Sequence, residues 1–251
     1  MKKTIIILQA RTGSQRYPKK VLAKIEGKPM IWHIINRLKK VKNAEKTILA
    51  TTNFHEDDKL VKIASNNGIS FFRGPKNNVL KRFFQCALIF EAHTIIRITG
   101  DCPLVDPKLI DEMISFFNLH NFDYVSNTIE PTFPDGLDIE IFSFSTLEKL
   151  LKKSKLKSEK EHVTSYILNH KKEFKIYNYE NKINLSHIRL TVDEKQDIKL
   201  IRKIYSQMKP LLIFSSTRVL KLLKNQPQLL EINKNLKRNQ GYINSLRRVH
   251  H

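Results

Sequence analysis

The chain has 251 residues, of which 41% are apolar, and its formal net charge at pH 7 is +21. This length and composition predict one folded domain of substantial size and exclude disorder over most of the chain. They also predict no membrane insertion and no signal sequence, because the apolar run before Gln9 is short and no other run reaches about 18 residues.

Four short apolar runs in the first half of the chain suit buried strands: Thr4–Gln9, Lys46–Thr51, Ser70–Arg73 and Thr94–Thr99. Helical patterns follow them, at about Pro29–Val41, Asp57–Asn67, Val79–Phe90 and Lys108–Leu119. Repeated alternation of strand and helix predicts an α/β fold with a doubly wound, mostly parallel sheet. In such a sheet, ligands bind at the carboxyl ends of the strands.

The second half of the chain has a less regular pattern. It predicts strands at Tyr124–Ser126, Asp138–Phe142, Lys175–Tyr179 and Ile188–Val192. It predicts helices at Ser145–Lys153, from near Glu161, at Glu194–Met208 and at Ser216–Lys224. We expect one domain over residues 1–209, with a distinct region at about 127–187, and a basic helical extension over 210–251.

The positive charge does not gather in one segment. Lys is scattered through every predicted helix, which favours a solvated basic surface over a specific nucleic-acid site. Such a surface still attracts anionic substrates. The two cysteines are too few for a disulfide framework and indicate a reducing, cytoplasmic location.

A loop of small and basic residues directly follows the first predicted strand. It carries Arg11, Gly13, Ser14, Arg16 and Lys20. Free backbone N–H groups, a hydroxyl and fixed positive charges suit a polyphosphate, so this loop predicts a nucleotide site. We include Leu8 and Ala10 in that site because they adjoin the loop.

Polar or small residues also lie at the carboxyl ends of the next three strands. They are Thr51, Thr52, Arg73, Gly74, Thr99 and Gly100. Because carboxyl ends of parallel strands share one edge, we expect these residues beside the nucleotide, with Arg73 and Gly74 near the base. Cys102 is expected to be a small packing residue.

Two aspartates stand at the ends of predicted strands. Asp101 ends a buried strand, where an unpaired carboxylate is costly unless it meets a cation, and Mg²⁺ satisfies it. Asp193 follows the predicted strand Ile188–Val192, where it could instead cap the next helix.

Acidic residues and one histidine mark the middle region. Asp138 and Glu140 would share one face of a strand, close to Asp135, and could bind sugar hydroxyls, hold a cation or accept a proton. A solvated turn and strand edge is the alternative. His162 could accept a proton from a hydroxyl, although a hydrogen-bonding or interface role suits a lone histidine at a helix start better.

Seven motifs together resemble the cytidylyltransferases that activate acidic sugars, specifically the SpsF-type proteins of spore-coat polysaccharide biosynthesis. They are Gln9–Lys20, Arg73-Gly74, Thr99–Pro103, Asp123–Asn127, Pro134–Glu140, Glu161–Thr164 and Leu190–Asp193. The resemblance covers roughly the first 205 residues. It implies the Rossmann-like fold of nucleotide-sugar transferases and the transfer of CMP from CTP to a sugar, with release of pyrophosphate.

The resemblance also implies roles for single residues. Arg11 and Lys20 would be catalytic, Asp101 and Asp193 would hold Mg²⁺, and the middle region would bind the sugar acceptor and form a homodimer. Sialic-type nine-carbon acids, eight-carbon ulosonic acids and sugar phosphates are all candidate acceptors. Asn77-Asn78 stand where related sequences carry acidic residues, which leaves the choice of base open.

Other functions compete with this interpretation. A transferase that uses another nucleotide, or a glycosyltransferase that consumes a nucleotide sugar, would use the same loop and aspartate pair. A nucleic-acid-binding protein would be motivated by charge alone and leaves Asp101 and Asp193 unexplained. Neither the Walker motif nor the dinucleotide glycine fingerprint occurs in the sequence.

Overall fold

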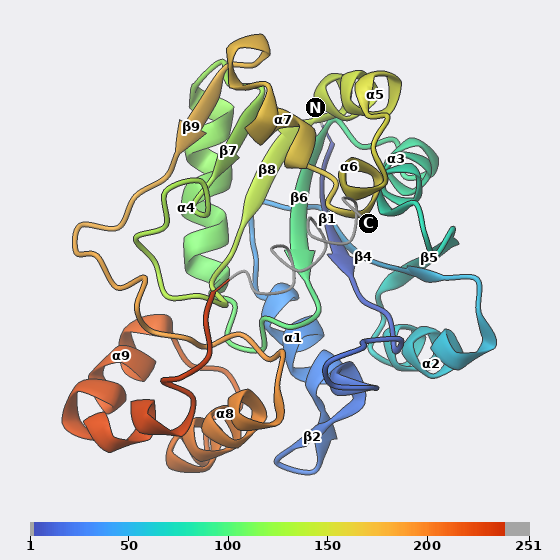
Figure 1. Cartoon of the computed structure of the whole chain (residues 1–251). Coiled ribbons are helices and arrows are strands. Elements are labelled where there is room, and N and C mark those ends of the chain that lie inside the picture. Colours follow the sequence, from blue (N-terminus) through green and yellow to red (C-terminus); the bar gives the residue numbers. More distant parts are fainter. Residues whose placement is uncertain (1–2, 239–251) are drawn as a thin grey trace.

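A computed structural model describes residues 3–238, and the basic end of the expected C-terminal extension lies outside this range. Seven strands form one sheet in the order β5-β4-β1-β6-β8-β7-β9, with helices on both faces (Figure 1). The strands are β1 Thr4–Gln9, β4 Lys46–Thr52, β5 Ser70–Gly74, β6 Thr94–Thr99, β7 Tyr124–Ser126, β8 Glu140–Ser143 and β9 Ile176–Asn178. The doubly wound, mostly parallel sheet expected from the sequence is confirmed.

Strands β1, β4, β5 and β6 are parallel to one another, and β9 is parallel to β7. Of the seven strands, β8 alone runs antiparallel to its neighbours, β6 and β7. The chain adds β4 and β5 on one side of β1 and then crosses to place β6 on the other side. The carboxyl ends of β1 and β6 therefore form the point where the winding direction reverses. Ligands of open α/β sheets bind in the crevice at such a point.

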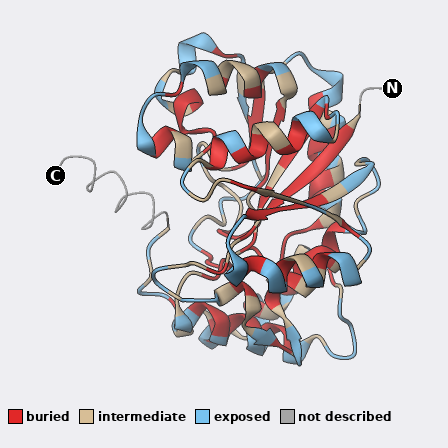
Figure 2. Cartoon of the chain, turned by 90° about the vertical axis from the view of Figure 1, so that its right-hand side faces the viewer, coloured by how far each residue is buried: buried red, intermediate tan, exposed pale blue. Residues whose placement is uncertain are grey.

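Alternating side chains of the central strands build two apolar layers. Ile5 and Ile7 of β1 join one cluster, whereas Ile6 and Leu8 join the other. The Leu8 side chain is therefore in the core. Both faces of these strands are covered, which explains why runs of Ile suit them. Figure 2 shows the central strands buried and the helices exposed on their outer sides.

Helices that cover the first face contribute to the cluster around Ile6 and Leu8. They are α1 Met30–Leu38, α2 Asp58–Asn66, α4 Pro107–Leu119 and α8 Lys195–Gln207, with α9 Ser216–Asn225 packed beyond α8. The other face is covered by α3 Val79–Ile89, α5 Phe144–Lys153 and α7 Ser165–Asn169, and the short α6 Lys157–Glu161 lies against α3. A small hairpin, β2 Lys24–Ile25 and β3 Lys28–Pro29, follows the basic loop.

Several helices begin where their sequences provide a cap. The side chains of Asn78, Ser143 and Ser215 accept backbone N–H groups of α3, α5 and α9, and Asp106 does the same for α4. Each such cap contributes about 1 kcal/mol. The observed helix starts therefore follow from local sequence.

The expected strand Ile188–Val192 is wrong. This segment forms only an isolated bridge between Arg189 and Asp135. Its backbone bonds go to two separate loops: Leu190 donates to the Asp135 carbonyl at 2.6 Å, and Val192 donates to the Asp101 carbonyl at 2.8 Å. The alternating apolar residues are buried, but no continuous strand lies beside them to form a ladder.

Two further element predictions are wrong in their limits. Helix α6 ends at Glu161 and does not begin there, because the chain turns at His162 and Val163. Strand β8 begins at Glu140, so Asp138 lies in the preceding loop and does not share a strand face with Glu140. The loop turns at Gly136, whose φ of +103° suits glycine.

The C-terminal segment packs on the domain as far as the structure describes it. Phe214, Val219, Leu223 and Leu229 are buried in the same cluster as the apolar side of α8. Within residues 3–238, the structure contains no helix whose length and apolar content would let it cross a membrane.

Candidate active site

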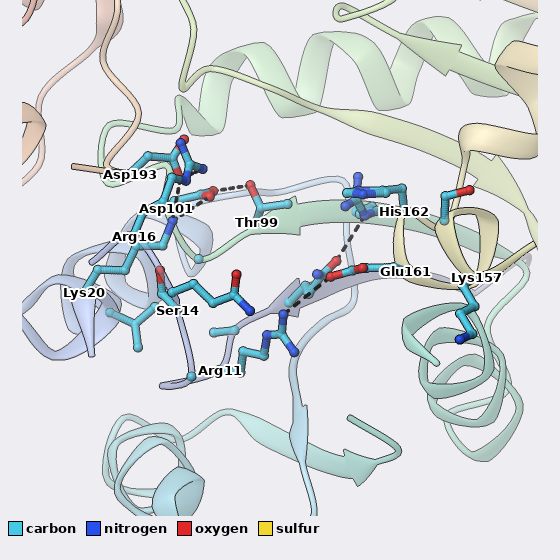
Figure 3. Close-up of a pocket in the computed structure, with 18 residues that line it drawn as sticks. Arg11, Ser14, Arg16, Lys20, Thr99, Asp101, Lys157, Glu161, His162 and Asp193 are labelled. Carbon is cyan, nitrogen blue, oxygen red and sulfur yellow. Dashed lines mark hydrogen bonds and ion pairs between the residues drawn. The ribbon is translucent and has the colours of Figure 1, made fainter. Parts of the chain in front are cut away.

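A cavity of about 560 Å³ opens at the carboxyl ends of β1 and β6. The loop after β1 forms one wall with Ala10, Arg11, Gly13, Ser14 and Arg16. Thr99 and Gly100 form the end of the β6 wall. Figure 3 shows Asp101, Asp193, Arg16 and Lys20 on one side of this cavity, and Glu161, His162 and Lys157 on the other.

At the end of the cavity that contains Asp101 and Asp193, the charged side chains surround the Lys20 ammonium group. Lys20 Nζ lies 3.0 Å from Asp101 Oδ2 and 2.8 Å from Asp193 Oδ1. Arg16 Nη2 adds a second contact to Asp193 at 2.8 Å. Residues 173 positions apart in the sequence therefore meet at one charged point.

The charges at this end support one another. Burial by itself would raise the pKa of Asp101, but the Lys20 ammonium and the Thr99 hydroxyl lower this pKa to about 2. Burial would lower the pKa of Lys20, and the two carboxylates overcome that effect and raise it. Asp101 and Lys20 are therefore both charged at neutral pH.

Arg189 holds Asp193 from behind. Its guanidinium contacts Asp193 at 3.2 Å and Asp135 at 2.8 Å, and two parallel bonds of 2.9 and 3.0 Å join it to Asp197. The backbone N–H groups of Asp193 and Glu194 both donate to Asp197. Asp197 thus caps α8 from its first turn, and Asp193 lies just before that helix.

The two cavity aspartates suit a hard divalent cation. Both carboxylates reach the same atom, Lys20 Nζ, so they are close enough to share one cation. Among residues 3–238, no cluster of three or more His, Cys, Asp or Glu side chains is placed to hold a metal ion. Two carboxylates completed by phosphate oxygens and water are typical of Mg²⁺.

Thr51 and Thr52 lie beside the loop after β1 but do not line the cavity. Both are buried, and their hydroxyls donate to the carboxylate of Asp57. Asp57 also accepts the backbone N–H of Thr12 at 2.8 Å and the Thr12 hydroxyl at 2.7 Å. This carboxylate therefore ties the loop after β1 to the end of β4.

Asp57 was missed from the sequence because it was assigned only as a helix start. Two threonines that end a strand, followed five positions later by an aspartate, were the available signal. Burial would raise the pKa of Asp57, but the hydroxyl and N–H donors outweigh it, so the pKa is lowered.

Arg73 and Gly74 also support this wall without lining the cavity. Arg73 donates to the carbonyls of Thr52 and Phe54 and forms a 2.6 Å ion pair with Asp58. A Cβ on Gly74 would approach Arg82 Cγ to 2.8 Å, so the small residue permits close packing on α3. The region assigned to the base is thus a fixed framework.

Arg97 was also missed, although an arginine inside an apolar strand is a signal of a special environment. It lines the cavity, and Nη1 forms an ion pair with Glu140. Glu140 accepts the Tyr124 hydroxyl at 2.6 Å and the Thr164 hydroxyl at 2.5 Å. Glu140 lies behind Arg97 and does not line the cavity itself.

The remaining predicted acceptor residues are divided. His162 lines the cavity, where burial lowers its pKa. Asp138 and Asp135 lie outside its lining and contact Arg238, with 2.8 Å between Arg238 Nη2 and Asp138 Oδ1. Burial raises the pKa of Asp138 to about 7 despite the opposing charge of Arg238.

The chain is 37% identical to the uncharacterized protein MJ1063 of Methanocaldococcus jannaschii, over 94% of this chain and 96% of the relative. It is 30% identical to the spore coat polysaccharide biosynthesis protein SpsF of Bacillus subtilis, over 90% and 96%. A solved cytidylyltransferase structure from Leptospira borgpetersenii superposes with a TM-score of 0.89 at 33% identity, covering 94% of this chain and 98% of that chain.

The cytidylyltransferase family profile matches residues 5–236, which include the whole cavity. The family resemblance expected from the sequence is therefore confirmed: this chain belongs to the cytidylyltransferase family.

Proposed function

We propose that this protein transfers CMP from CTP to the hydroxyl group of a sugar and releases pyrophosphate, in the synthesis of a surface polysaccharide or glycoconjugate. Family membership and the similarity to SpsF support this function. The observation that carries it is the meeting of the basic loop with Asp101 and Asp193 at the point where the sheet reverses its winding.

The basic loop would bind the phosphates. Arg11 and Arg16 offer guanidinium groups that bind phosphate oxygens in pairs, and Ser14 offers a hydroxyl. A Cβ on Gly13 would meet no atom within 4 Å, so the loop leaves open space at this point. The cations would neutralise the charge that develops on the departing pyrophosphate.

Asp101 and Asp193 would hold Mg²⁺ together with the phosphates. The metal, when bound, would neutralise charge on the reacting phosphate. In this structure, Lys20 neutralises the same two carboxylates. When Mg²⁺ takes this role, the Lys20 ammonium group would have to move toward the phosphates. Arg189 and Asp197 would keep Asp193 in place throughout.

The framework around Asp57 would hold the nucleotide-binding wall of the cavity in place. It includes Thr51, Thr52, Arg73 and Gly74. The region at about 127–187 would bind the acceptor and contribute to a homodimer. The two cysteines, Cys86 and Cys102, are buried free thiols, which suits the cytoplasmic location that we propose.

Pyrophosphate release tests the function directly. The protein is incubated with Mg²⁺ and each of CTP, UTP, GTP and ATP, against a panel of sugar acids and sugar phosphates. We expect release with CTP that depends on one acceptor. Asp101→Asn should lower the rate by at least about 100-fold, because it removes charge that balances the metal at the transferred phosphate.

The control is the melting temperature of the Asp101→Asn variant, which should show a folded protein. Undiminished turnover in this variant would refute the assignment of Asp101. Nucleotide-sugar consumption without pyrophosphate release would instead support a glycosyltransferase.

A further inference from the structure

Three polar side chains continue the apolar layer of one sheet face toward the cavity. Ile7, Ile95 and Phe142 belong to the buried cluster on that face. Two positions further along β1 and β6, and two positions before Phe142 on the antiparallel β8, the residues are Gln9, Arg97 and Glu140. Side chains two positions apart in a strand share a face, so these three form a polar layer above the apolar one.

Arg97 is held rigidly in this layer. Its Nε donates to Gln9 Oε1 at 3.2 Å, Nη1 is paired with Glu140, and Arg97 and Glu140 are also cross-strand partners. Glu140 in turn is fixed by the hydroxyls of Tyr124 and Thr164. Fixed donors recognise an anion better than mobile ones, because less side-chain freedom is lost on binding.

The positive member of this polar layer faces the cavity, and the negative member does not. Arg97 and Gln9 line the cavity, whereas Glu140 lies behind them. The Arg97 side chain is 14% exposed. Lys157 and His162 line the same cavity, on the side opposite Asp101 and Asp193 (Figure 3). Glu161 is the acidic residue on this side of the cavity, and its Oε1 lies 3.6 Å from Arg11 Nη2, so Arg11 balances its charge.

We propose that Arg97 binds the anionic group of the acceptor, a carboxylate or a phosphate, and that it thereby determines the specificity for acidic acceptors. This inference rests on the proposed function. The nucleotide phosphates would occupy the end with Asp101 and Asp193, so an acceptor anchored at Arg97 lies across the cavity with its hydroxyl directed to the reacting phosphate. Lys157 adds positive charge, and Glu140 keeps Arg97 in position.

Equilibrium binding tests this role without turnover. Wild-type protein, Arg97→Gln and Arg97→Lys are loaded with Mg²⁺ and CDP. CDP is chosen because it has only two phosphates and cannot release pyrophosphate. The loaded proteins are then titrated with a nine-carbon sialic acid and an eight-carbon ulosonic acid, each also as its neutral methyl ester, and with a sugar phosphate and its unphosphorylated sugar. Arg218→Gln, a change at an exposed arginine of α9, is the matched control.

We expect the wild type to bind one acidic probe at least tenfold more tightly than its neutral counterpart. Arg97→Gln should lose this preference while its CDP affinity stays within about twofold of wild type. Arg97→Lys should fall between them, because it retains the charge but not the planar fork. Preference for an acid over the phosphate, or the reverse, identifies the anion.

Three results would overturn the inference: no acidic probe binds to the CDP-loaded wild type, Arg97→Gln weakens acid and ester equally, or Arg218→Gln has the same effect. Failure of CDP and CTP to bind at all would instead count against the proposed function. If Arg97→Gln does not fold, as judged by thermal melting, the Arg97→Lys variant decides by the same comparison.

Discussion

Single carboxylates do different work in this site according to their partners. Asp101 and Asp193 share the ammonium group of Lys20 and face the cavity. Asp57 accepts only hydroxyl and backbone N–H donors and is buried. The same residue type therefore pairs with a cationic side chain at one strand end and serves as a structural anchor at another.

The anchoring role of Asp57 predicts a dependence of stability on pH. Its pKa in the folded protein is lowered from 3.8. Its ionised form therefore stabilises the fold above pH 3.8, and this contribution is lost as pH falls through the lowered value. Asp57→Asn should lower the free energy of unfolding by about 2 kcal/mol at pH 7, because it weakens several buried hydrogen bonds.

Urea unfolding of both proteins between neutral pH and pH 3 measures this effect. The difference between them should shrink as pH falls below 3.8. Glu56→Gln, at the exposed position next to Asp57, serves as the control. A difference that stays constant over the whole range would contradict the prediction.

At the scale of elements, loops complete the site that the sheet begins. The segment 188–192 carries Asp193 to the cavity, although it pairs with other segments only at separate points. One of these points is the turn at Gly136. A Cβ at this position would lie 2.5 Å from Thr191 N and 2.6 Å from Leu190 C, so the turn and the segment pack backbone against backbone.

Gly136→Ala should therefore displace the segment that ends in Asp193. We expect a loss of at least about 2 kcal/mol in unfolding free energy, from steric overlap in addition to the unfavourable φ. Turnover should fall more than tenfold in protein that is still folded. Thermal unfolding and pyrophosphate release measure the two effects.

Gly68→Ala is a matched control for this change. Gly68 also has a positive φ, of +70°, but a Cβ there would meet no atom within 4 Å. It should lose about 1 kcal/mol from the backbone conformation and keep its activity. Equal effects of the two substitutions would show that backbone strain alone, and not the contact with the 188–192 segment, matters at Gly136.

At the scale of the whole molecule, the excess of positive charge acts on encounter with substrate. The net charge of +21 comes from 45 basic residues against 24 acidic ones. The loop after β1 adds local cations at the cavity. A positive field draws a nucleoside triphosphate toward the protein. Salt screens this field over about 8 Å at physiological ionic strength.

We therefore expect kcat/KM for CTP to fall about threefold to tenfold between roughly 50 and 300 mM KCl. At saturating CTP, kcat should change little, because the bound phosphates are already in contact with the loop. Steady-state kinetics at several salt concentrations provide the measurement. An equal fall in kcat and in kcat/KM would indicate that salt acts on the chemical step or on the fold.

The sequence by itself determined the strands of the parallel half, the helices that follow them and the basic loop after β1. These features depend on patterns local in the sequence: runs of Ile, caps such as Asn78 and Asp106, and small residues after a strand. The family motifs are also local. The positions of Arg11, Arg16, Lys20 and Asp101 around one crevice then follow from parallel strands ending at the same edge of a sheet.

Only the tertiary structure decided which polar residues face that crevice. Arg97 and Glu140 are 43 positions apart, and register alone makes them partners. Asp57 is directed to Thr12 by the packing of β4 beside β1, and Ile188–Val192 stays extended without a ladder because two loops accept its bonds. A buried polar group takes the partner that the fold brings within about 3 Å, and that partner is set by chain segments far away in the sequence.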